Sequence, residues 1–256
     1  MSTDVPAAID LSRTLIGLDF DGTLSDIVAD PEDARPVPGA LAALSALASA
    51  GTTVAIVTGR DVETVLRLSG LAEVPGMVVS GLHGAQWWRD GRLHSRPEPP
   101  GIDPLRAQLT DLLADAPPGV HLEDKGLSLV VHARQSADPD AALAALDEPV
   151  GRLAAEADLE TLGGKGVIEI RIPNLSKADA VAELLEPDTG TAIFAGDDIG
   201  DLPAFEAVHA WGSRTGRAGI AVAVGEVEPV REAADVRLDH PVDLVRWLES
   251  LVARRA

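Results

Sequence analysis

The sequence predicts an α/β protein in which a parallel sheet, covered by helices on both faces, is interrupted by a smaller inserted α+β domain. Near both ends of the chain, short apolar runs alternate with segments of helical periodicity, which is the rhythm of a doubly wound sheet. In the middle, strand-like runs come in adjacent pairs, which is typical of antiparallel hairpins. The 256 residues, 46% of them hydrophobic, suffice for one large domain or two modest ones.

The first part of the chain carries the opening strands and helices of the parallel sheet. A helix over 38–50 is rich in Ala and Leu and ends at Gly51, and a helix over 61–68 begins with Asp61 as its N-cap. The strands are short and apolar, and they cover 14–20, 53–57 and 77–79. Because strands and helices alternate, the connections predict parallel strands.

A change of pattern after the third strand marks the start of the interruption. Residues 87–94 predict a hairpin turned by Asp90-Gly91, and a proline-rich linker follows over 96–101. Consecutive prolines cannot continue a helix or a central strand, so we expect the core domain to be interrupted at this linker.

The inserted segment contains helix starts and paired strands. Helices are expected to open at Asp103-Pro104 and Asp138-Pro139, where an acidic residue precedes a proline. Strand-like runs cover 120–123, 127–132, 159–162 and 167–172. We therefore expect an antiparallel sheet with two helices in this domain.

The first rhythm resumes near Ser176. A helix over 177–185 begins with a Ser176/Asp179 capping pattern. A strand over 191–195, a short helix, a strand over 219–224 and a closing helix over 242–252 follow in order. We expect residues 1–100 and 173–256 to form one core domain and residues 101–172 to form the insertion.

The charge balance excludes some classes of partner. The chain has 41 acidic and 21 basic residues, a formal net charge of −20, so we expect neither nucleic acid nor an anionic membrane surface as partner. The absence of cysteine excludes disulfides, zinc–thiolate sites and a thiol nucleophile. No signal peptide is evident, and no run reaches the ~18 apolar residues of a membrane span. We expect a soluble, cytoplasmic protein, and a monomer is compatible with the sequence.

The first strand ends in two acidic residues, Asp19 and Asp21. Alternation along a strand directs both side chains to one side, and Gly22 allows a sharp turn. Ligands of an open parallel sheet bind outside the carboxyl ends of its strands, so these carboxylates lie where chemistry is expected. An EF-hand-like calcium loop is excluded because its sixth and twelfth positions are Leu24 and Asp30. A solvated acidic turn is the alternative for this motif alone.

Polar residues also end the other predicted strands. Thr58 places a hydroxyl at the same sheet edge, although a turn or helix-cap role is equally compatible with it. Asp197, Asp198 and Asp201 follow the strand over 191–195. Such crowding of carboxylates favours a divalent ion with oxygen ligands, most often Mg²⁺. We expect Asp197 as a direct ligand, since Asp198 could accept backbone hydrogen bonds and Asp201 could cap the next helix. Lys177, one of three lysines in the chain, adds a positive charge.

Taken in order, these motifs resemble those of the haloacid dehalogenase superfamily of phosphatases, which have a Rossmann-like core. The resemblance is carried by Asp19-Phe20-Asp21-Gly22-Thr23, Thr58, Lys177 and Gly196-Asp197-Asp198-Ile199-Gly200-Asp201. It implies that Asp19 is a nucleophile that forms an aspartyl-phosphate and that Asp21 is the general acid and base. Thr58 and Lys177 would hold the phosphoryl oxygens. Mg²⁺ would be bound by Asp19, Asp197 and the backbone carbonyl of Asp21. The insertion between Thr58 and Lys177 corresponds to a C2-type cap.

The inserted segment is similar to that of trehalose-6-phosphate phosphatases. The similarity is carried by residues 122–129, 131–134 and 164–171, together with 21–31 and 80–84 in the core. It implies substrate contacts from Glu123, Lys125, Arg134 and Glu169, and we expect further contacts from Arg60 and His83. His83 could instead support its own loop, and residues 123–126 could form only a charged turn. Ala178 departs from the family, which usually has glycine after the lysine.

The sequence thus predicts a Mg²⁺-dependent phosphatase that hydrolyses trehalose 6-phosphate to trehalose and phosphate. One alternative is a related phosphatase acting on a sucrose, mannosylglycerate or monosaccharide phosphate. The other is a non-catalytic sensor of sugar phosphates on the same fold. A sensor is expected to lack the nucleophile, the acid/base residue or the metal ligand, whereas Asp19, Asp21 and Asp197 are all present.

Overall fold

A computed structural model describes residues 9–164 and 166–253, and the chain divides into two compact units. Unit 1 comprises Met1–His94 and Ser176–Ala256, and unit 2 comprises Ser95–Leu175. Lys165, part of the motif over 164–171, lies outside the described residues. The fold class predicted from the sequence, a parallel α/β core with an α+β insertion, is confirmed.

Unit 1 is built on an eight-stranded sheet with the order β12-β11-β10-β1-β2-β3-β4-β5. The strands from β12 to β3 run parallel, and β4 pairs antiparallel with β3. Their bounds are β1 Thr14–Leu18, β2 Thr53–Val57, β3 Val78–Gly81, β4 Gln86–Arg89, β5 Arg92–Ser95, β10 Thr191–Gly196, β11 Ala218–Val224 and β12 Val236–Leu238. From β1 the chain adds β2 to β5 in order toward one edge of the sheet, and from β10 it adds β11 and β12 toward the other edge. The crevice at this reversal, between β1 and β10, is the expected ligand position of such a sheet.

Helices cover both faces of this sheet. On one face the core cluster takes residues from α1 (Ala40–Ser49), α2 (Val62–Ser69) and α8 (Pro241–Ala253). On the other it takes residues from α5 (Lys177–Leu184), α6 (Leu202–Thr215) and α7 (Glu228–Ala233). Burial on both faces explains why the central strands read as continuous apolar runs rather than alternating patterns. Single 3₁₀ turns lie at Leu11–Arg13, Pro31–Asp33, Leu71–Glu73, Leu82–Gly84 and Ile199–Asp201.

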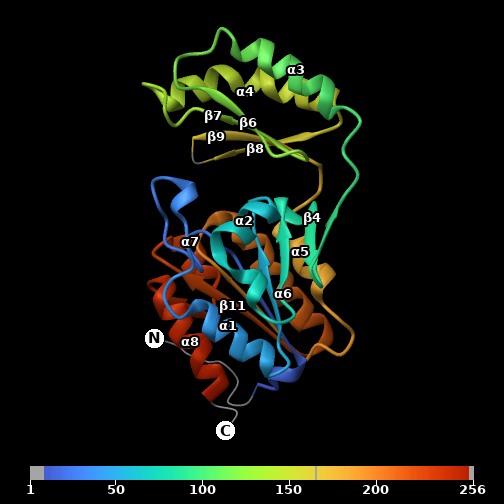
Figure 1. The fold of residues 1–256 in the computed structure, drawn as a ribbon, viewed down its shortest axis with the longest axis vertical. Helices are drawn as coiled ribbons and strands as arrows, with labels where there is room; N and C mark the ends of the chain where they lie inside the picture. Colours follow the sequence, from blue (N-terminus) through green and yellow to red (C-terminus); the bar gives the residue numbers. More distant parts are fainter. Residues whose placement is uncertain (1–8, 165, 254–256) are drawn as a thin grey trace. The chain divides into compact units, whose positions relative to one another are not determined.

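Unit 2 is a four-stranded antiparallel sheet with two helices on one face (Figure 1). The sheet order is β6 (His121–Asp124), β7 (Leu129–His132), β9 (Val167–Arg171) and β8 (Glu160–Gly164). Leu129, Val131, Ile168 and Ile170 form its core with α3 (Ile102–Leu113) and α4 (Pro139–Glu156). Since side chains alternate along a strand, the residues between them lie on the helix-free face.

Some predicted elements differ in detail from the structure. Helix α3 begins at Ile102 after the N-cap Gly101, so the prediction of Asp103 as N-cap is wrong. Ile102 is buried in the core of unit 2, which extends the helix backward and leaves Pro104 in the first turn, where proline is tolerated. The expected short helix is the 14-residue α6. Helix α7 and the three-residue strand β12 were not predicted, because both are too short for a clear period.

Candidate active site

The first carboxylate lies at the end of β1. Leu18 is the last residue of the strand, and the backbone N–H of Asp19 donates to the carbonyl of Ala195 at 2.9 Å. This bond continues the pairing of β1 with β10, so Asp19 stands at the crevice between the two strands. Its side chain is buried, and its Oδ1 lies 2.8 Å from Nζ of Lys177.

Lys177 is the first residue of α5, and its ammonium lies between two carboxylates. Ser176 caps the helix by accepting the N–H of Asp179, as predicted. Besides Asp19, Nζ of Lys177 donates to Oδ1 of Asp201 at 2.6 Å. Asp201 is fully buried, and its Oδ2 accepts the backbone N–H groups of Asp197 at 3.0 Å and Asp198 at 3.1 Å. Asp201 therefore ties the lysine to the loop after β10.

Burial and neighbouring charges shift the pKa values of Lys177 and Asp19. Burial alone would lower the pKa of Lys177, but Asp19 and Asp201 outweigh it and raise that pKa, so the ammonium form is kept. Burial raises the pKa of Asp19, and the carboxylates of Asp201 and Asp197 raise it further, against the opposing effect of Lys177. The cluster thus carries more negative charge than one ammonium balances.

The donor set of this cluster fits a hard divalent cation. Carboxylate oxygens of Asp19, Asp197 and Asp201 all lie within 4.8 Å of one another, and oxygen is the ligand that such cations prefer. Both oxygens of Asp201 are already engaged, by Lys177 and by two backbone N–H groups. Asp19 and Asp197 are therefore the better candidates for direct contact with a metal.

Gly22 allows the chain to approach Asp197 closely. Its φ is +84°, and a Cβ added there would lie 2.2 Å from Oδ2 of Asp197. On the same side, the hydroxyl of Thr23 donates to Oδ1 of Asp197 at 3.4 Å. The Asp-Gly-Thr part of the first motif thus shapes the surroundings of the acid that follows β10.

The second acid of the motif is held by an arginine. Arg60 donates from Nε to Oδ2 of Asp21 at 2.7 Å and from Nη2 to Oδ1 at 2.6 Å, a two-point contact that fixes the plane of the carboxylate. Its Nη1 donates to the carbonyl of Pro31 at 2.9 Å. In this structure Arg60 binds Asp21, and its predicted contact with substrate stays a prediction.

Thr58 and His83 are joined through the backbone at the end of β2. Thr58 is buried, and its Oγ1 accepts the N–H of Arg60 at 3.2 Å. This hydrogen bond within the turn corresponds to the alternative role that the sequence allowed for Thr58. The N–H of His83 donates to the carbonyl of Thr58 at 3.1 Å. Leu82 and His83 both have positive φ, 47° and 55°, a strained backbone of the kind that clusters at functional sites.

The imidazole of His83 lies against the turn that follows Thr58. A Cβ added to Gly59 would lie 2.9 Å from Nε2 of His83, which leaves room only for glycine at that position. His83 therefore packs against the loop after β2, and its predicted contact with substrate stays a prediction.

Four predicted contact residues belong to unit 2. Glu123 pairs with Val130, and Val130 pairs with Glu169, so both acids lie on the helix-free face of the sheet. Nε2 of His132 lies 2.7 Å from Oε2 of Glu123, and Nζ of Lys125 lies 4.0 Å from the same oxygen. Arg134 follows β7, where its Cγ would lie 2.7 Å from a Cβ added to Gly166. This face of unit 2 thus carries both acids, together with the apolar side chains of Val130 and Leu162.

The pairings of Asp201 with Lys177 and of Arg60 with Asp21 were not predicted from the sequence. Asp198 and Asp201 form a capping box around the 3₁₀ turn Ile199–Asp201, and the three-residue spacing of these acids was the signal for it. The second contact of Asp201, to Lys177, joins residues 24 positions apart. Arg60 and Asp21 are separated by 39 positions. No local pattern could have revealed either pairing.

Comparison with known proteins places this geometry in a family. The family model described as Trehalose-phosphatase matches residues 17–241. The chain belongs to the trehalose-phosphatase family. This confirms the resemblance seen in the sequence, and the family implies a divalent metal, for which the acidic cluster is suited.

Individual relatives agree with the family assignment. The trehalose-phosphate phosphatase of Mycobacterium avium (strain 104) is 39% identical over 204 residues, which are 75% of this chain and 50% of that protein. This chain thus spans about half the length of that trehalose-phosphatase. The crystal structure of a trehalose-6-phosphate phosphatase related protein superposes with a TM-score of 0.75 at 26% identity, covering 93% of this chain and 97% of the other.

A more distant structure supports the fold alone. A haloacid dehalogenase-like hydrolase from Bacteroides thetaiotaomicron has a TM-score of 0.70 at 17% identity and covers 93% of this chain and 99% of its own. This chain therefore shares the fold of that structure. Within residues 9–164 and 166–253, none of the helices has the length and hydropathy needed to span a bilayer.

Proposed function

We propose that this chain is a Mg²⁺-dependent phosphatase that hydrolyses trehalose 6-phosphate to trehalose and phosphate. The observation that carries the proposal is the placement of Asp19 beside Lys177 at the crevice between β1 and β10, in a chain of the trehalose-phosphatase family. Conversion of a phosphate monoester to an alcohol and phosphate needs a nucleophile, a proton donor and cations around the phosphoryl group. The core of unit 1 supplies groups for each of these needs.

Asp19 is the proposed nucleophile. One of its carboxylate oxygens attacks phosphorus, the bond from phosphorus to the sugar oxygen breaks, and an aspartyl-phosphate forms. Water then attacks this phosphorus, which releases phosphate and restores the carboxylate of Asp19. Splitting the displacement into two steps is the advantage of covalent catalysis.

Asp21 is the proposed general acid and base. It gives a proton to the departing sugar oxygen in the first step and takes a proton from the attacking water in the second, which typically contributes about 10²–10⁴-fold in rate. Arg60 engages both oxygens of Asp21. To donate or accept a proton, one oxygen of Asp21 must break its hydrogen bond with Arg60. The remaining hydrogen bond keeps the carboxyl group oriented between the two proton transfers.

Lys177 and Thr58 are proposed to hold the phosphoryl oxygens. An ammonium has three donors, and the contacts with Asp19 and Asp201 use two of them, so the third can reach a phosphoryl oxygen. Asp19, Asp197 and the backbone carbonyl of Asp21 would hold Mg²⁺. When bound, the metal ion supplies positive charge that offsets charge on the transferred group.

Substrate selection is proposed to lie with the insertion. We propose that residues 1–100 and 173–256 act as the catalytic core and that residues 101–172 act as the cap that grips the sugar. Glu123, Lys125, Arg134 and Glu169 are the proposed sugar contacts, and Arg60 and His83 are further candidates. Hydrogen-bonding groups of this kind penalise analogues that lack a hydroxyl. A small sugar phosphate in the cytoplasm is the proposed partner.

A phosphate-release assay over a panel of sugar phosphates tests this proposal. The purified chain with Mg²⁺ should release phosphate from trehalose 6-phosphate faster than from sucrose, mannosylglycerate or glucose phosphates. A chelator should abolish the release, and added Mg²⁺ should restore it. Release from another sugar phosphate but not from trehalose 6-phosphate would refute the substrate while sparing the chemistry.

A further inference from the structure

A pocket lies in unit 1, on the hairpin that forms the edge of the sheet. It has a volume of about 500 Å³, within the usual range of small-molecule sites. Its lining comes from β4, from β5 with the turn between them, and from α5. The lining residues are Trp87, Arg89, Asp90, Arg92, His94 and Glu183.

The register of the sheet separates this pocket from the active site. In the antiparallel pair of β3 with β4, Gly81 pairs with Gln86 and Val79 with Trp88, so β4 runs back from the carboxyl edge of the parallel strands. Arg89, the turn Asp90-Gly91 and Arg92 therefore lie toward the amino edge. Asp19 and Thr58 follow the carboxyl ends of β1 and β2, at the opposite edge.

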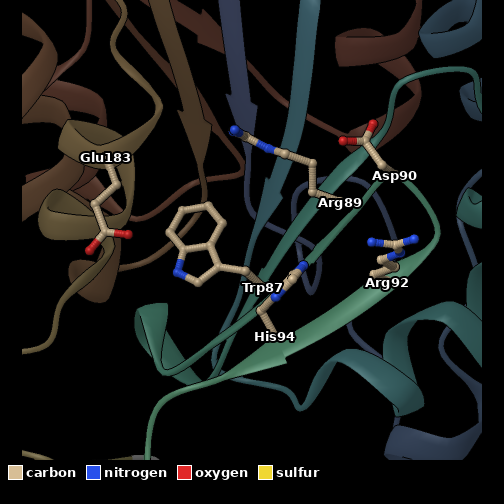
Figure 2. Close-up of a pocket in the computed structure, with 6 residues that line it drawn as sticks. All are labelled: Trp87, Arg89, Asp90, Arg92, His94 and Glu183. Atoms are coloured by element: carbon tan, nitrogen blue, oxygen red, sulfur yellow. The ribbon is translucent and has the colours of Figure 1, made fainter.

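The hairpin directs one aromatic ring and three basic side chains to the same pocket. Trp88 packs on the cluster of α1, α2 and α8, whereas Trp87 packs on the cluster of α5, α6 and α7, as alternation along a strand requires. Figure 2 shows Trp87 and Arg89 extending from the hairpin toward the helix that carries Glu183. The indole of Trp87 is only partly buried, so part of the ring faces the pocket.

Two of the basic groups have no acidic partner. Within the part of the chain that the structure describes, the side chains of Arg89 and Arg92 make no hydrogen bond or ion pair. Guanidinium groups bind phosphate through paired, charge-assisted hydrogen bonds, so two of them in one pocket are suited to a phosphate group.

The other lining residues suit a sugar ring. The indole of Trp87 offers an apolar surface to the C–H groups of such a ring. The carboxylate of Asp90, at the tip of the hairpin, can accept hydrogen bonds from hydroxyl groups. From this combination of guanidinium pair, indole and acceptor, we infer that the pocket is a second binding site, which takes a phosphorylated sugar away from the catalytic edge.

Tryptophan fluorescence of the full chain, titrated with glucose 6-phosphate, tests the inference. We expect a saturable change, because among the four tryptophans of the chain Trp87 lines the pocket. The double variant Arg89→Ala/Arg92→Ala should weaken binding about tenfold or more, since it removes both charge-assisted contacts. Arg214→Ala, which removes one positive charge from the exposed last turn of α6, should leave binding unchanged.

Further ligands and variants define the outcomes. Trp87→Phe should abolish the fluorescence signal, and circular dichroism should show that each variant is folded. Glucose alone and inorganic phosphate alone should each bind more weakly than glucose 6-phosphate. Equal binding of inorganic phosphate would overturn the assignment to a sugar phosphate. Unchanged binding by the double variant, or no saturable change with the parent chain, would overturn the site itself.

Discussion

Lys177 supplies the positive charge that compensates the buried carboxylates of the candidate active site. It is buried between Asp19 and Asp201, and Asp201 in turn accepts two backbone N–H groups of the loop after β10. Removing one member of a buried pair leaves the other charged and without compensation, which is more damaging than losing an exposed pair. Asp201 therefore fixes the position of Lys177 and of the backbone at Asp197.

The variant Asp201→Asn tests this arrangement. Its amide can accept fewer of the present hydrogen bonds, so we expect the free energy of unfolding to fall by roughly 3–5 kcal/mol. Urea denaturation measures this loss. Asp239→Asn is the matched control, because it removes a carboxylate from an exposed pair with Arg231, where about 1 kcal/mol or less is expected. Equal effects of the two changes would contradict the structural role of Asp201.

Asp21→Asn tests the acid/base role separately from the nucleophile. With trehalose 6-phosphate the rate should fall by about 10²–10⁴-fold, because the sugar oxygen leaves poorly without a proton. With p-nitrophenyl phosphate the fall in the rate of aspartyl-phosphate formation should be much smaller, because nitrophenolate leaves without one. Burst-phase measurements separate this step from the second. An equal loss on both substrates would show that Asp21 does not protonate the leaving group.

At the scale of elements, the turn after β1 brings the first motif against the loop after β10. Gly22 makes this possible, because its φ is +84° and a Cβ there would overlap the carboxylate of Asp197. Two separate constraints therefore act at this position: the backbone conformation and the contact.

Gly22→Ala and Gly225→Ala separate these two constraints. Gly225 has a similar φ of +89°, but a Cβ added there would meet nothing within 4 Å. Both changes should lower the free energy of unfolding by about 1–2 kcal/mol through the backbone. Only Gly22→Ala should also displace Asp197, and the predicted result is a large loss of phosphate release with weaker Mg²⁺ binding. If both variants lose activity equally, the contact with Asp197 is not what requires glycine.

The pairing of β6 with β7 gives a pH-dependent contribution to stability. The hydrogen bond from His132 lowers the pKa of Glu123. A lowered carboxyl pKa stabilises the fold above the unfolded value of about 4.3, and this contribution is lost as the pH falls through the folded value. Thermal unfolding from about pH 6 to about pH 3 should therefore show a smaller decline for Glu123→Gln than for the parent chain. Glu148→Gln, on an exposed helix position, should decline like the parent. An unchanged decline in Glu123→Gln would contradict this contribution.

The sequence predicted the elements whose patterns are local. The central strands are buried on both faces and read as apolar runs, and the polar residues that end them follow from the rule for ligands of parallel sheets. Capping by Ser176 and Asp138 was also local and was predicted correctly. The start of α3 was not, because burial of Ile102 outweighed the Asp-Pro signal. Likewise, the hydrogen bond of Arg60 with Asp21 could not be predicted, because it depends on the pairing of β1 with β2.

At the scale of the whole molecule, the net charge of −20 opposes an anionic substrate. Attraction of the proposed substrate must therefore be local, from the proposed metal ion and from a few cations placed by the fold. Lys177 is such a cation, held in its charged form by two carboxylates. Arg89 and Arg92 lie together with Asp90 and Glu183 in the pocket at the opposite edge of the same sheet.

Detection of a phosphoryl group on Asp19 tests the central claim most directly. The chain is mixed with trehalose 6-phosphate and Mg²⁺, quenched in acid within one turnover, digested, and mapped by mass spectrometry. We predict one phosphoryl group on the peptide that contains Asp19, and neither this group nor phosphate release in Asp19→Asn. Steady release of phosphate with no phosphoryl group on Asp19, undiminished in Asp19→Asn, would contradict the account.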